Sequence, residues 1–460
     1  MHRPFRLILA TMFVAWHAGP ALADQATLPP VLNAGERVLQ FDWPTLEIGT
    51  GEYAEGPTGL TVIRFARRAY AAVDVRGGGP GTVNTDYLRL GYDSNELDAV
   101  VFSGGSWYGL EGTTAVASAL KDDGIRDGDW NNLALAVGAI IYDLGPRRLN
   151  EIYPDKRLAQ AAYRAARPGI FPLGAHGAGR FAKTGALFGC NAYSGQGAAF
   201  RQIGDLKLAA FAVVNALGVV TTREGRVAAC YRDAGWPLEL RTTDLLAHYP
   251  ASGKPGSTLG ATTAQGRRNT TVSLIVTNQK LAPAELQRLA THVHSSMSRA
   301  IQPFATEFDG DVLYAVSTGE WQPTKEKPGW PSVELDVVAA EVMWDAVLSS
   351  VPEQPPVTKP AQARGAATDV ASGWAGDYVF SPQVTVRITA TPGGALRAQA
   401  TGGRDAYAIG RTAPVLLEPV AVNRFTVPGR YPLVLEFRPP DELIINPGHW
   451  QQTGLRRSSR

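Results

Sequence analysis

Two kinds of hydrophobic periodicity alternate between residues 24 and 351. Short apolar runs rich in β-branched residues predict strands, and longer stretches with apolar residues three and four positions apart predict helices. The expected strands are 97–102, 133–142, 206–220, 270–277 and 311–316, and the expected helices are 113–120, 157–167, 284 to about 301, and 333–347. Strands that alternate with helices in this way predict a layered α/β architecture.

The pattern changes after residue 351. Residues 352–372 are rich in Pro, Ala and Thr, a composition typical of a linker. From residue 373 to 460, short alternating runs such as 384–388 and 433–437 are separated by turn signals. We therefore expect a small antiparallel all-β domain without a catalytic constellation of its own. It could mediate assembly, cover the active site or bind cell-wall material.

The first 23 residues have the pattern of an export signal. A basic start precedes an apolar stretch, and Ala21-Leu22-Ala23 is a small-x-small cleavage site. The apolar stretch is too short to span a bilayer, and no second long apolar run follows it. We expect the mature protein, without a membrane anchor, in a periplasm or outside the cell.

Composition and charge narrow the possible partners and ligands. The chain has 44 basic and 42 acidic residues, so its charge gives no reason to expect binding to nucleic acid or to an anionic membrane. The seven histidines are scattered, and no zinc-ligand spacing is found, so no metal is expected. Cys190 and Cys230 are the two cysteines. An oxidising compartment permits a disulfide between them, but the sequence does not show whether they lie close enough.

The most informative segment is Asn269-Thr270-Thr271 with the β-rich run that follows it. A threonine after Asn ends a polar stretch and immediately opens a strand. Its hydroxyl can attack the preceding carbonyl through a five-membered ring, and cleavage before Thr270 would free an α-amine that can act as the base for the same hydroxyl. That amine titrates near about 8, close to working pH. On these residues alone, a threonine-rich strand start without chemistry is the alternative.

Two other motifs point less clearly to chemistry. Gly104-Gly105-Ser106-Trp107-Tyr108-Gly109 looks like a nucleophile elbow, but an elbow needs glycine two residues after the serine, where Tyr108 stands. We expect Ser106 to be a helix cap or a substrate-loop residue beside Trp107. The run 77–81 has four glycines but no Lys-Ser/Thr after it. It predicts a tight loop near the active site, and no cofactor is expected.

Four segments follow one another in a fixed order along roughly residues 55–350. They are 74–82, 104–110, Val213-Val214-Asn215-Ala216, and Asn269-Thr270 with its strand. This order resembles the self-cleaving aminopeptidases, which include the β-aminopeptidases and the D-/L-aminopeptidase–esterases. The resemblance implies a four-layer αββα sandwich of the N-terminal-nucleophile-hydrolase type and cleavage between Asn269 and Thr270. It also implies hydrolysis of small peptides or amino-acid amides from the amino end, and a homo-oligomer, a tetramer in that family.

The same resemblance implies roles for single residues. Thr270 takes the nucleophile position, where most members have serine. Asn215 would donate its side-chain amide to the oxyanion, with help from Tyr142, and one such donor contributes about 3 to 4 kcal/mol. Lys183 matches a lysine of a threonine-type branch that includes nylon-oligomer hydrolases, and would keep the α-amine neutral or orient an acid. Without the resemblance, Asn215 would be read as a buried amide, Tyr142 as a strand-end aromatic and Lys183 as a surface lysine.

Asp309 and Asp311 stand where the family has a polar pair before a strand. Most relatives have Ser and Glu there, whereas the threonine branch has two acids. Side chains two residues apart on an extended segment point the same way, so both carboxylates could face Thr270. One would orient the amine, and the other would bind a substrate ammonium.

The sequence thus predicts an exported, self-processing hydrolase that cleaves amides with Thr270, and it leaves the substrate open. β-Peptides, D-amino acid amides or esters, and ω-amino acid oligomers all fit. Two other classes of function remain possible. One is a serine esterase or penicillin-recognising hydrolase, suggested by the small β domain. The other is a periplasmic binding protein of the same fold that is never cleaved.

Overall fold

The computed structural model describes most of the chain after the expected signal peptide. The described residues are 25–89, 95–126, 129–145, 148–190, 192–228, 230, 237, 239–249, 269–352, 373–427, 433–448 and 450–458. The expected signal peptide, and the expected linker apart from its first residue, lie outside this set. Within the set, no helix combines the length and the apolar character needed to cross a bilayer.

A single mixed sheet of 11 strands within the described residues forms the centre of the first domain. Its main path runs β12-β13-β15-β17-β4-β6-β7-β5, while β3 pairs with β4, β1 and β8. The long strand β4 pairs with β17 near its end and with β3 near its start, so it belongs to both halves of the sheet. The bounds are β1 (Val31–Leu32), β3 (Leu46–Tyr53), β4 (Thr58–Val75), β5 (Thr82–Val83), β6 (Glu96–Ser103), β7 (Ala136–Ile140), β8 (Arg167–Pro168), β12 (Gln196–Ile203), β13 (Leu206–Asn215), β15 (Thr270–Gln279) and β17 (Val312–Trp321).

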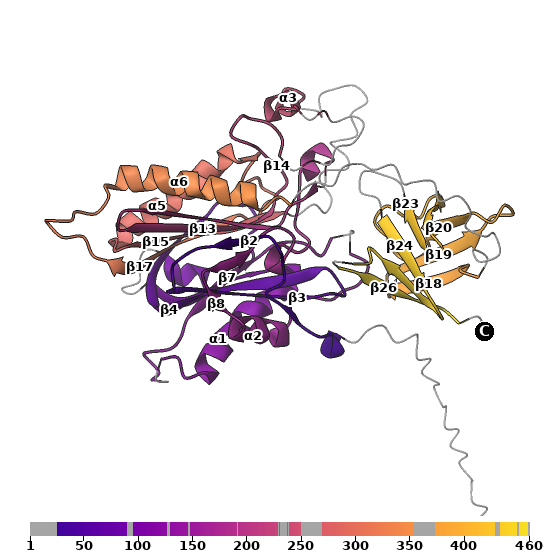
Figure 1. Ribbon diagram of the computed structural model, residues 1–460, viewed down its shortest axis with the longest axis horizontal. Helices are drawn as coiled ribbons and strands as arrows, with labels where there is room; N and C mark the ends of the chain where they lie inside the picture. Colours follow the sequence, from indigo (N-terminus) through magenta and orange to yellow (C-terminus); the bar gives the residue numbers. More distant parts are fainter. Residues whose placement is uncertain are drawn as a thin grey trace, which may run out of the picture.

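Helices cover both outer faces of this folded sheet (Figure 1). Helices α5 (Pro283–Ser296) and α6 (Ser332–Ser349) pack over β12, β13 and β17 around one apolar core. Helices α1 (Glu111–Asp122) and α2 (Lys156–Arg164) pack over β3, β4, β6 and β7 around another. A third core fills the space between the two halves of the sheet. The expected αββα sandwich is confirmed, and each layer buries the apolar face of its neighbour.

Two predicted elements end earlier than their apolar runs suggested. The strand expected over 206–220 stops at Asn215, and β14 (Val219–Val220) pairs instead with β16 (Ile301–Gln302). Between them the chain turns, and the carbonyl of Gly218 accepts hydrogen bonds from the Thr184 hydroxyl and the Gly185 N–H. The helix expected to reach residue 301 ends at Ser296, since its last residues form a short 3-10 turn and then β16.

The helix expected over 157–167 is also shorter, because Arg167–Pro168 forms β8 against β3. The sequence missed β3 and most of β4, although β4 is the longest strand described. Polar residues interrupt its apolar run, and its pairing with β6 shifts register between Arg64 and Ala69. A strand that bends through two halves of a sheet has no constant buried face, so its sequence lacks the simple alternation that marks a flat strand.

The C-terminal domain is an antiparallel sheet of nine strands within the described residues, as the alternating pattern predicted. The strand order is β21-β20-β19-β18-β26-β25-β24-β23-β22, around its own apolar core. In Figure 1 this domain lies beside the first, with β26 near the junction. The bounds are β18 (Gly376–Ser381), β19 (Val384–Ala390), β20 (Leu396–Ala400), β21 (Val415–Leu416), β22 (Glu418–Ala421), β23 (Arg424–Val427), β24 (Leu433–Arg438), β25 (Glu442–Ile445) and β26 (Gln452–Arg456).

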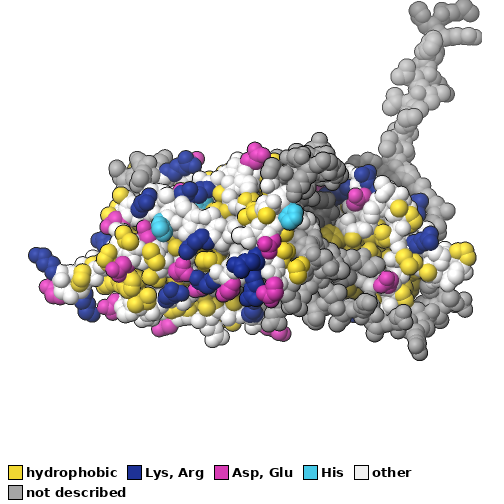
Figure 2. Space-filling model, turned by 90° about the horizontal axis from the view of Figure 1, so that it is seen from above, with side chains coloured by type: hydrophobic (Ala, Val, Ile, Leu, Met, Phe, Trp, Pro, Cys, Tyr) yellow, Lys and Arg dark blue, Asp and Glu magenta, His cyan; other side chains and the backbone are white. Residues whose placement is uncertain are grey.

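Charges of both signs are interspersed on the face of the molecule shown in Figure 2. Lysines, arginines, aspartates and glutamates lie among apolar and neutral side chains there, as the near-balance of 44 basic and 42 acidic residues would suggest.

Candidate active site

Thr270 is the first residue of β15, a central strand between β13 and β17. In the register of these strands, Thr270 lies opposite Asn215, and Val272 lies opposite Val312. The Thr270 side chain is buried, and its hydroxyl donates a hydrogen bond to the carbonyl oxygen of Asn269. The predicted nucleophile therefore contacts the carbonyl group that precedes it.

A second donor reaches the same carbonyl oxygen. The backbone N–H of Gly310 donates to the Asn269 oxygen at 2.9 Å, and the Asn269 N–H donates to the carbonyl of Phe308 at 2.9 Å. A Cβ atom at Gly310 would lie only 2.9 Å from the Thr270 hydroxyl oxygen. Because glycine has no Cβ, residue 310 can lie close to the Thr270 hydroxyl while its N–H donates to the Asn269 carbonyl. The sequence analysis missed Gly310, although a glycine between two acids was the available signal.

Asp311 lies one residue beyond Gly310 and is buried. Its carboxylate accepts hydrogen bonds from the backbone N–H of Thr271 and, at 3.0 Å, of Ala305. Burial, and then the nearby charge of Asp309, raise the pKa of Asp311 well above its usual range. A buried acid with this shift, next to the start of β15, keeps its proton to a higher pH than an ordinary aspartate does.

Asp309 is also buried, but it serves a different part of the loop. Its carboxylate accepts from the Leu217 N–H at 3.2 Å, and from the Thr306 N–H at 3.1 Å and hydroxyl at 2.6 Å. Burial raises the pKa of Asp309 above its usual value despite these hydrogen bonds. From the sequence, we expected the carboxylates of Asp309 and Asp311 both to face Thr270. The structure brings both to the start of β15, each among backbone donors, and a substrate-ammonium role stays a prediction.

The glycine run 77–79 packs directly against the Asp309–Asp311 segment. The Gly79 N–H donates to the Asp309 carbonyl at 2.9 Å, and the Gly77 N–H donates to the Asp311 carbonyl at 3.2 Å. A Cβ at Gly77 would meet the Asp311 nitrogen at 2.1 Å, so the two backbones touch. The run is thus a tight loop beside the candidate site, as the sequence predicted.

Asn215 ends β13, and its side chain is held at both polar ends. Its Oδ1 accepts from the Lys183 N–H at 3.0 Å, and its Nδ2 donates to the Tyr142 carbonyl at 3.2 Å. Its own carbonyl accepts from the Asn269 side-chain amide at 3.0 Å. The structure therefore brings Asn215, Tyr142 and Lys183 together with Asn269 and Thr270.

Lys183 is buried, not the surface lysine that was the alternative. It forms β10 (Lys183–Thr184) and pairs with Tyr193 of β11 (Ala192–Tyr193). Its Nζ lies 2.7 Å from the centroid of the Tyr193 ring and 5.2 Å from that of Phe181. Aromatic faces attract a cation, so these rings stabilise a charged ammonium at this position.

Trp107 lies at the edge of the same region, with 45% of its surface exposed. Its ring meets the ring of Tyr142 edge to face, with centroids 6.3 Å apart. The neighbouring Ser106 is buried, and its hydroxyl oxygen accepts a hydrogen bond from the Leu144 N–H at 2.9 Å. The short 3-10 helix at 106–110 has Gly105 at its N-cap and no side-chain cap. The helix-cap interpretation of Ser106 is therefore wrong, and the residue fixes a loop.

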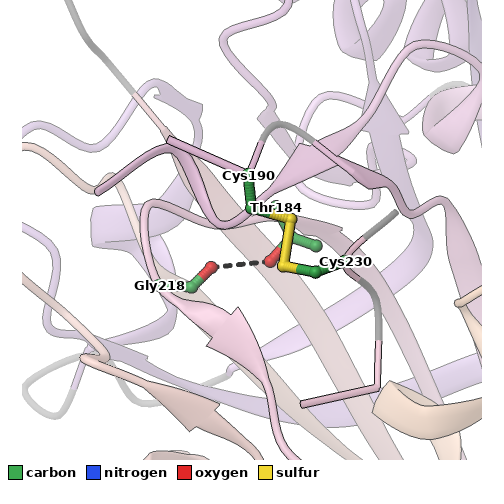
Figure 3. Close-up of a disulfide and its surroundings, with 4 residues drawn as sticks. All are labelled: Thr184, Cys190, Gly218 and Cys230. Atoms are coloured by element: carbon green, nitrogen blue, oxygen red, sulfur yellow. Dashed lines mark hydrogen bonds between the residues drawn. A yellow bond between two sulfur atoms is a disulfide. The ribbon is translucent and has the colours of Figure 1, made fainter. Parts of the chain in front are cut away.

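A disulfide joins Cys190 and Cys230, whose Cα atoms are 5.7 Å apart (Figure 3). It lies beside Thr184, whose hydroxyl donates to the Gly218 carbonyl at 2.6 Å. Cys190 falls between β10 and β11 in the chain. The structure thus answers the question that the sequence left open, and the bond ties down the hairpin that carries Lys183.

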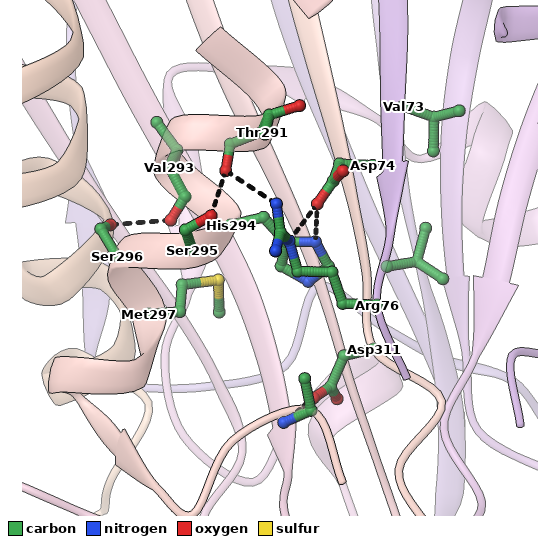
Figure 4. A network of polar contacts seen from close by, with 12 residues as sticks. Val73, Asp74, Arg76, Thr291, Val293, His294, Ser295, Ser296, Met297 and Asp311 are labelled. Atoms are coloured by element: carbon green, nitrogen blue, oxygen red, sulfur yellow. Dashed lines mark hydrogen bonds and ion pairs between the residues drawn. The ribbon is translucent and has the colours of Figure 1, made fainter. Parts of the chain in front are cut away.

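A histidine, an arginine and an aspartate form a second polar network close to Asp311, in which His294 is buried, Asp74 is partly buried and Arg76 is exposed (Figure 4). Asp74 accepts from His294 Nδ1 at 2.7 Å and from Arg76 Nε at 2.5 Å. Burial alone would raise the pKa of Asp74, but the hydrogen bond and charge of His294 and then of Arg76 bring it below its usual value. Burial lowers the pKa of His294, and Asp74 only partly opposes this. The backbone N–H of Arg76 also donates to the Asp311 carbonyl, so the network supports the loop beside the nucleophile.

The chain is similar in sequence to several known proteins. The model of peptidase family S58 matches residues 41–363. A 6-aminohexanoate-oligomer endohydrolase of Paenarthrobacter ureafaciens is 40% identical over 337 residues, which cover 71% of this chain and 90% of that protein. An uncharacterized aminopeptidase of Mycobacterium bovis is 32% identical over 316 residues, covering 65% of this chain and 87% of that protein.

Among solved structures, a Burkholderia sp. β-aminopeptidase is 20% identical with a TM-score of 0.47, and the match covers 67% of this chain and 84% of that one. The family match spans most of the first domain, and the relatives match over most of their own length. The family match and the relative at 40% identity confirm the resemblance seen in the sequence. The chain belongs to peptidase family S58 and is a hydrolase of amide bonds.

Proposed function

We propose that the protein is an exported amide hydrolase that cleaves its own backbone before Thr270 and then uses this residue as an N-terminal nucleophile. The observation that carries the proposal is the pair of donors on one oxygen. The Thr270 hydroxyl and the Gly310 N–H both contact the carbonyl oxygen of Asn269. The hydroxyl is thus held against the group it would attack, and the N–H can stabilise the charge that attack creates.

Self-cleavage would proceed through an ester. The Thr270 oxygen bonds to the Asn269 carbonyl carbon, and the hydroxyl proton passes to the Thr270 nitrogen as the carbon–nitrogen bond breaks. Water then hydrolyses the ester that links the two residues. The products are a carboxylate on Asn269 and a free hydroxyl and α-amine on Thr270. Asp311, whose pKa is raised by burial and by Asp309, is suited to carry the proton during these steps.

In the mature enzyme, the α-amine of Thr270 would take the proton from its own hydroxyl as the hydroxyl attacks a substrate amide. Asn215 would donate its side-chain amide to the oxyanion, because its orientation is fixed by Lys183 on one side and Tyr142 on the other. The substrate amine then leaves, and water releases the acyl group with the same α-amine as base.

For the substrate, we propose ω-amino acid oligomers and related amino-acid amides. Support comes from the relative at 40% identity, which is named for 6-aminohexanoate oligomers. Trp107 and Tyr142 also form an aromatic wall, which offers apolar contact area to a methylene chain. Cleavage from the amino end and cleavage within an oligomer are both compatible with this wall. β- and D-amino acid amides are the alternative substrates.

Export and assembly are part of the same proposal. Export is supported by the pattern of residues 1–23 and by the disulfide, since structural disulfides persist mainly in oxidising compartments. We propose a periplasmic or secreted homo-oligomer because the resembling aminopeptidases assemble in this way. Light scattering on the purified mature protein measures the subunit number directly.

Replacing the nucleophile tests the proposal. Wild-type protein and Thr270→Ser should run as two chains on a denaturing gel, with residue 270 at one new N-terminus by mass spectrometry. Thr270→Ala should stay as one chain and hydrolyse neither 6-aminohexanoate oligomers nor β-, D- and L-aminoacyl p-nitroanilides. Thr277→Ala, at the other end of the same strand and equally buried, is the matched control and should mature. Full turnover by intact wild-type protein, or maturation of Thr270→Ala, would rule the proposal out.

A further inference from the structure

The C-terminal domain lies outside the part of the chain that matches the family. The family model ends at residue 363, whereas the β-sheet of this domain begins at Gly376. The sequence left its role open between assembly, cover of the active site and binding of cell-wall material. Residues 450–453, at and just before the start of β26, contact the first domain. These contacts indicate a more specific role.

Backbone pairing at Gln451 joins the C-terminal domain to the first domain. Gln451 forms a parallel bridge with Glu55, in which the Gly56 N–H donates to the Gln451 carbonyl at 2.9 Å. In the same bridge the Gln451 N–H donates to the Ala54 carbonyl at 2.9 Å. Paired backbone groups fix both position and orientation, so this segment has one register against the first domain.

Buried side chains reinforce the bridge on both sides. The carboxylate of Glu55, itself buried, accepts from the Thr453 N–H and hydroxyl, both at 2.8 Å. The side-chain oxygen of Gln452 accepts from the backbone N–H groups of Leu149 and Asn150. Gln452 is 1% exposed, so these bonds are shielded from water. The two domains are thus held together by satisfied, buried polar groups.

Trp450 precedes this docked segment and packs on the first domain beside Lys183. Its ring meets Phe181 edge to face, with centroids 5.3 Å apart, and lies 6.3 Å from the ring of Tyr193. Phe181 and Tyr193 are the same two rings that hold the Lys183 ammonium. Trp450 therefore contacts, from the side of the C-terminal domain, both rings of the aromatic cage around Lys183.

The cage is connected directly to the oxyanion candidate. Lys183 and Tyr193 are paired across the β10–β11 hairpin, and the Lys183 N–H donates to the Oδ1 of Asn215 at 3.0 Å. Any shift of this hairpin moves the group that orients the Asn215 amide. A displacement of about 1 Å at such a group can cost on the order of 100-fold in rate.

We propose that Trp450 is a positioning residue for the oxyanion site of the first domain. By packing on Phe181 and Tyr193, it holds the β10–β11 hairpin in the position from which Lys183 orients Asn215. The C-terminal domain is then an integral part of the active site. This inference rests on the role that the proposed function gives to Asn215.

Three full-length variants test it, with kcat and KM measured per processed molecule. Trp450→Ala should lower kcat by about 10- to 100-fold with little change in KM, the range expected when an outer contact that orients an active-site group is lost. Trp450→Phe keeps a ring in the cage and should recover most of the rate. Trp374→Ala is the matched control: Trp374 stacks on Phe437 inside the same domain, with centroids 5.2 Å apart. It should keep the wild-type kcat.

A double-mutant cycle separates positioning from a general loss of stability. In an Asn215→Ala background, the further change Trp450→Ala should cost almost nothing, because the group that it positions is already absent. Self-cleavage should proceed in Trp450→Ala, since the donor to the Asn269 carbonyl is Gly310. Three results overturn the inference: an unchanged kcat in Trp450→Ala, an equal loss in Trp374→Ala, or a loss undiminished in the Asn215→Ala background.

Three outcomes separate the inference about Trp450 from the role proposed for Asn215. Failure of Trp450→Ala to mature, while Trp450→Phe and Trp374→Ala mature normally, counts against the inference because Trp450 would then be required for assembly of the whole site. If Asn215→Ala alone keeps the wild-type kcat, the proposed role of Asn215 fails, and this inference fails with it. If Asn215→Ala is impaired and Trp450→Ala is normal, only the inference about Trp450 fails.

Discussion

The backbone N–H of Gly310 lies 2.9 Å from the carbonyl oxygen of Asn269 and donates a hydrogen bond to it. The hydroxyl of Thr270 contacts the same oxygen. The bond before the nucleophile thus has a built-in donor that does not depend on any side chain. A backbone donor of this kind is rigid, and a rigid donor needs no reorganisation when charge develops on the oxygen.

Gly310→Ala should slow self-cleavage by about 100-fold or more, the usual effect of losing one oxyanion donor. The added Cβ would lie 2.9 Å from the Thr270 hydroxyl oxygen and 2.7 Å from the Gly79 carbonyl oxygen, so the loop must move away. The measurement is the rate at which freshly made precursor is converted to two chains. Gly79→Ala is the matched control, since a Cβ there meets nothing within 4 Å. Equal rates in the two variants would contradict the assignment.

Asp311 should make the folded protein less stable as pH rises. Its folded-state pKa lies well above the usual 3.8, first because of burial and then because of the charge on Asp309. Above pH 3.8 the folded protein therefore holds more protons than the unfolded chain, and the free energy of unfolding falls as pH rises through the folded-state pKa. The side chain of the Asp311→Asn variant does not titrate, so this variant lacks the pH dependence that Asp311 causes. Both proteins are compared in the uncut Thr270→Ala background, where unfolding involves a single chain.

The expected result is that the stability advantage of wild-type Asp311 over Asn shrinks between pH 4 and pH 8. Urea unfolding at several pH values measures this difference. An advantage that grows with pH would mean instead that the folded state favours the carboxylate over the acid, and the proton-carrying role of Asp311 would lose its physical basis.

His294 should have the opposite effect. Burial lowers its pKa below 6.5, and the hydrogen bond and charge of Asp74 only partly oppose this. The unfolded chain therefore binds the proton more readily, and stability is lost as pH falls below 6.5 through the folded-state pKa. The stability difference between wild type and His294→Gln, again in the uncut background, should grow as pH rises from about 5 to 7. A difference that shrinks would show that His294 is charged and paired with Asp74.

The sequence predicted those features that depend on local pattern. The helix and strand after Thr270, the layered α/β class and the antiparallel C-terminal sheet all follow from periodicity and turn residues, whereas the αββα arrangement was implied by the resemblance. Thr270 was found because a hydroxyl residue after Asn opens a predicted strand, and Asn215 was found through the resemblance to the aminopeptidase family. The structure places the two opposite each other in β13 and β15.

The features that the sequence missed depend on contacts between distant segments. Gly310 donates through its backbone, so its side chain gave no indication of the role, and only its place between two acids could have indicated it. Strand β4 bends through both halves of the sheet, so its alternation is broken. Trp450 reaches Phe181 from a separate domain, and no spacing in the chain reports that contact. Lys183 was predicted as a site residue through the resemblance, but its burial comes from tertiary packing that its glycine-rich surroundings in the sequence do not indicate.

The bond between Cys190 and Cys230 should stabilise the folded protein by about 2 to 4 kcal/mol, the typical effect of a disulfide that closes a loop of moderate length. The two cysteines are 40 residues apart, so the bond removes much of the freedom of the unfolded chain. The double variant Cys190→Ser/Cys230→Ser should therefore unfold at lower urea concentration than wild type. Reductant should lower the wild-type midpoint to that of the variant and leave the variant unchanged. If reductant shifts both proteins equally, the stabilisation comes from somewhere other than this bond.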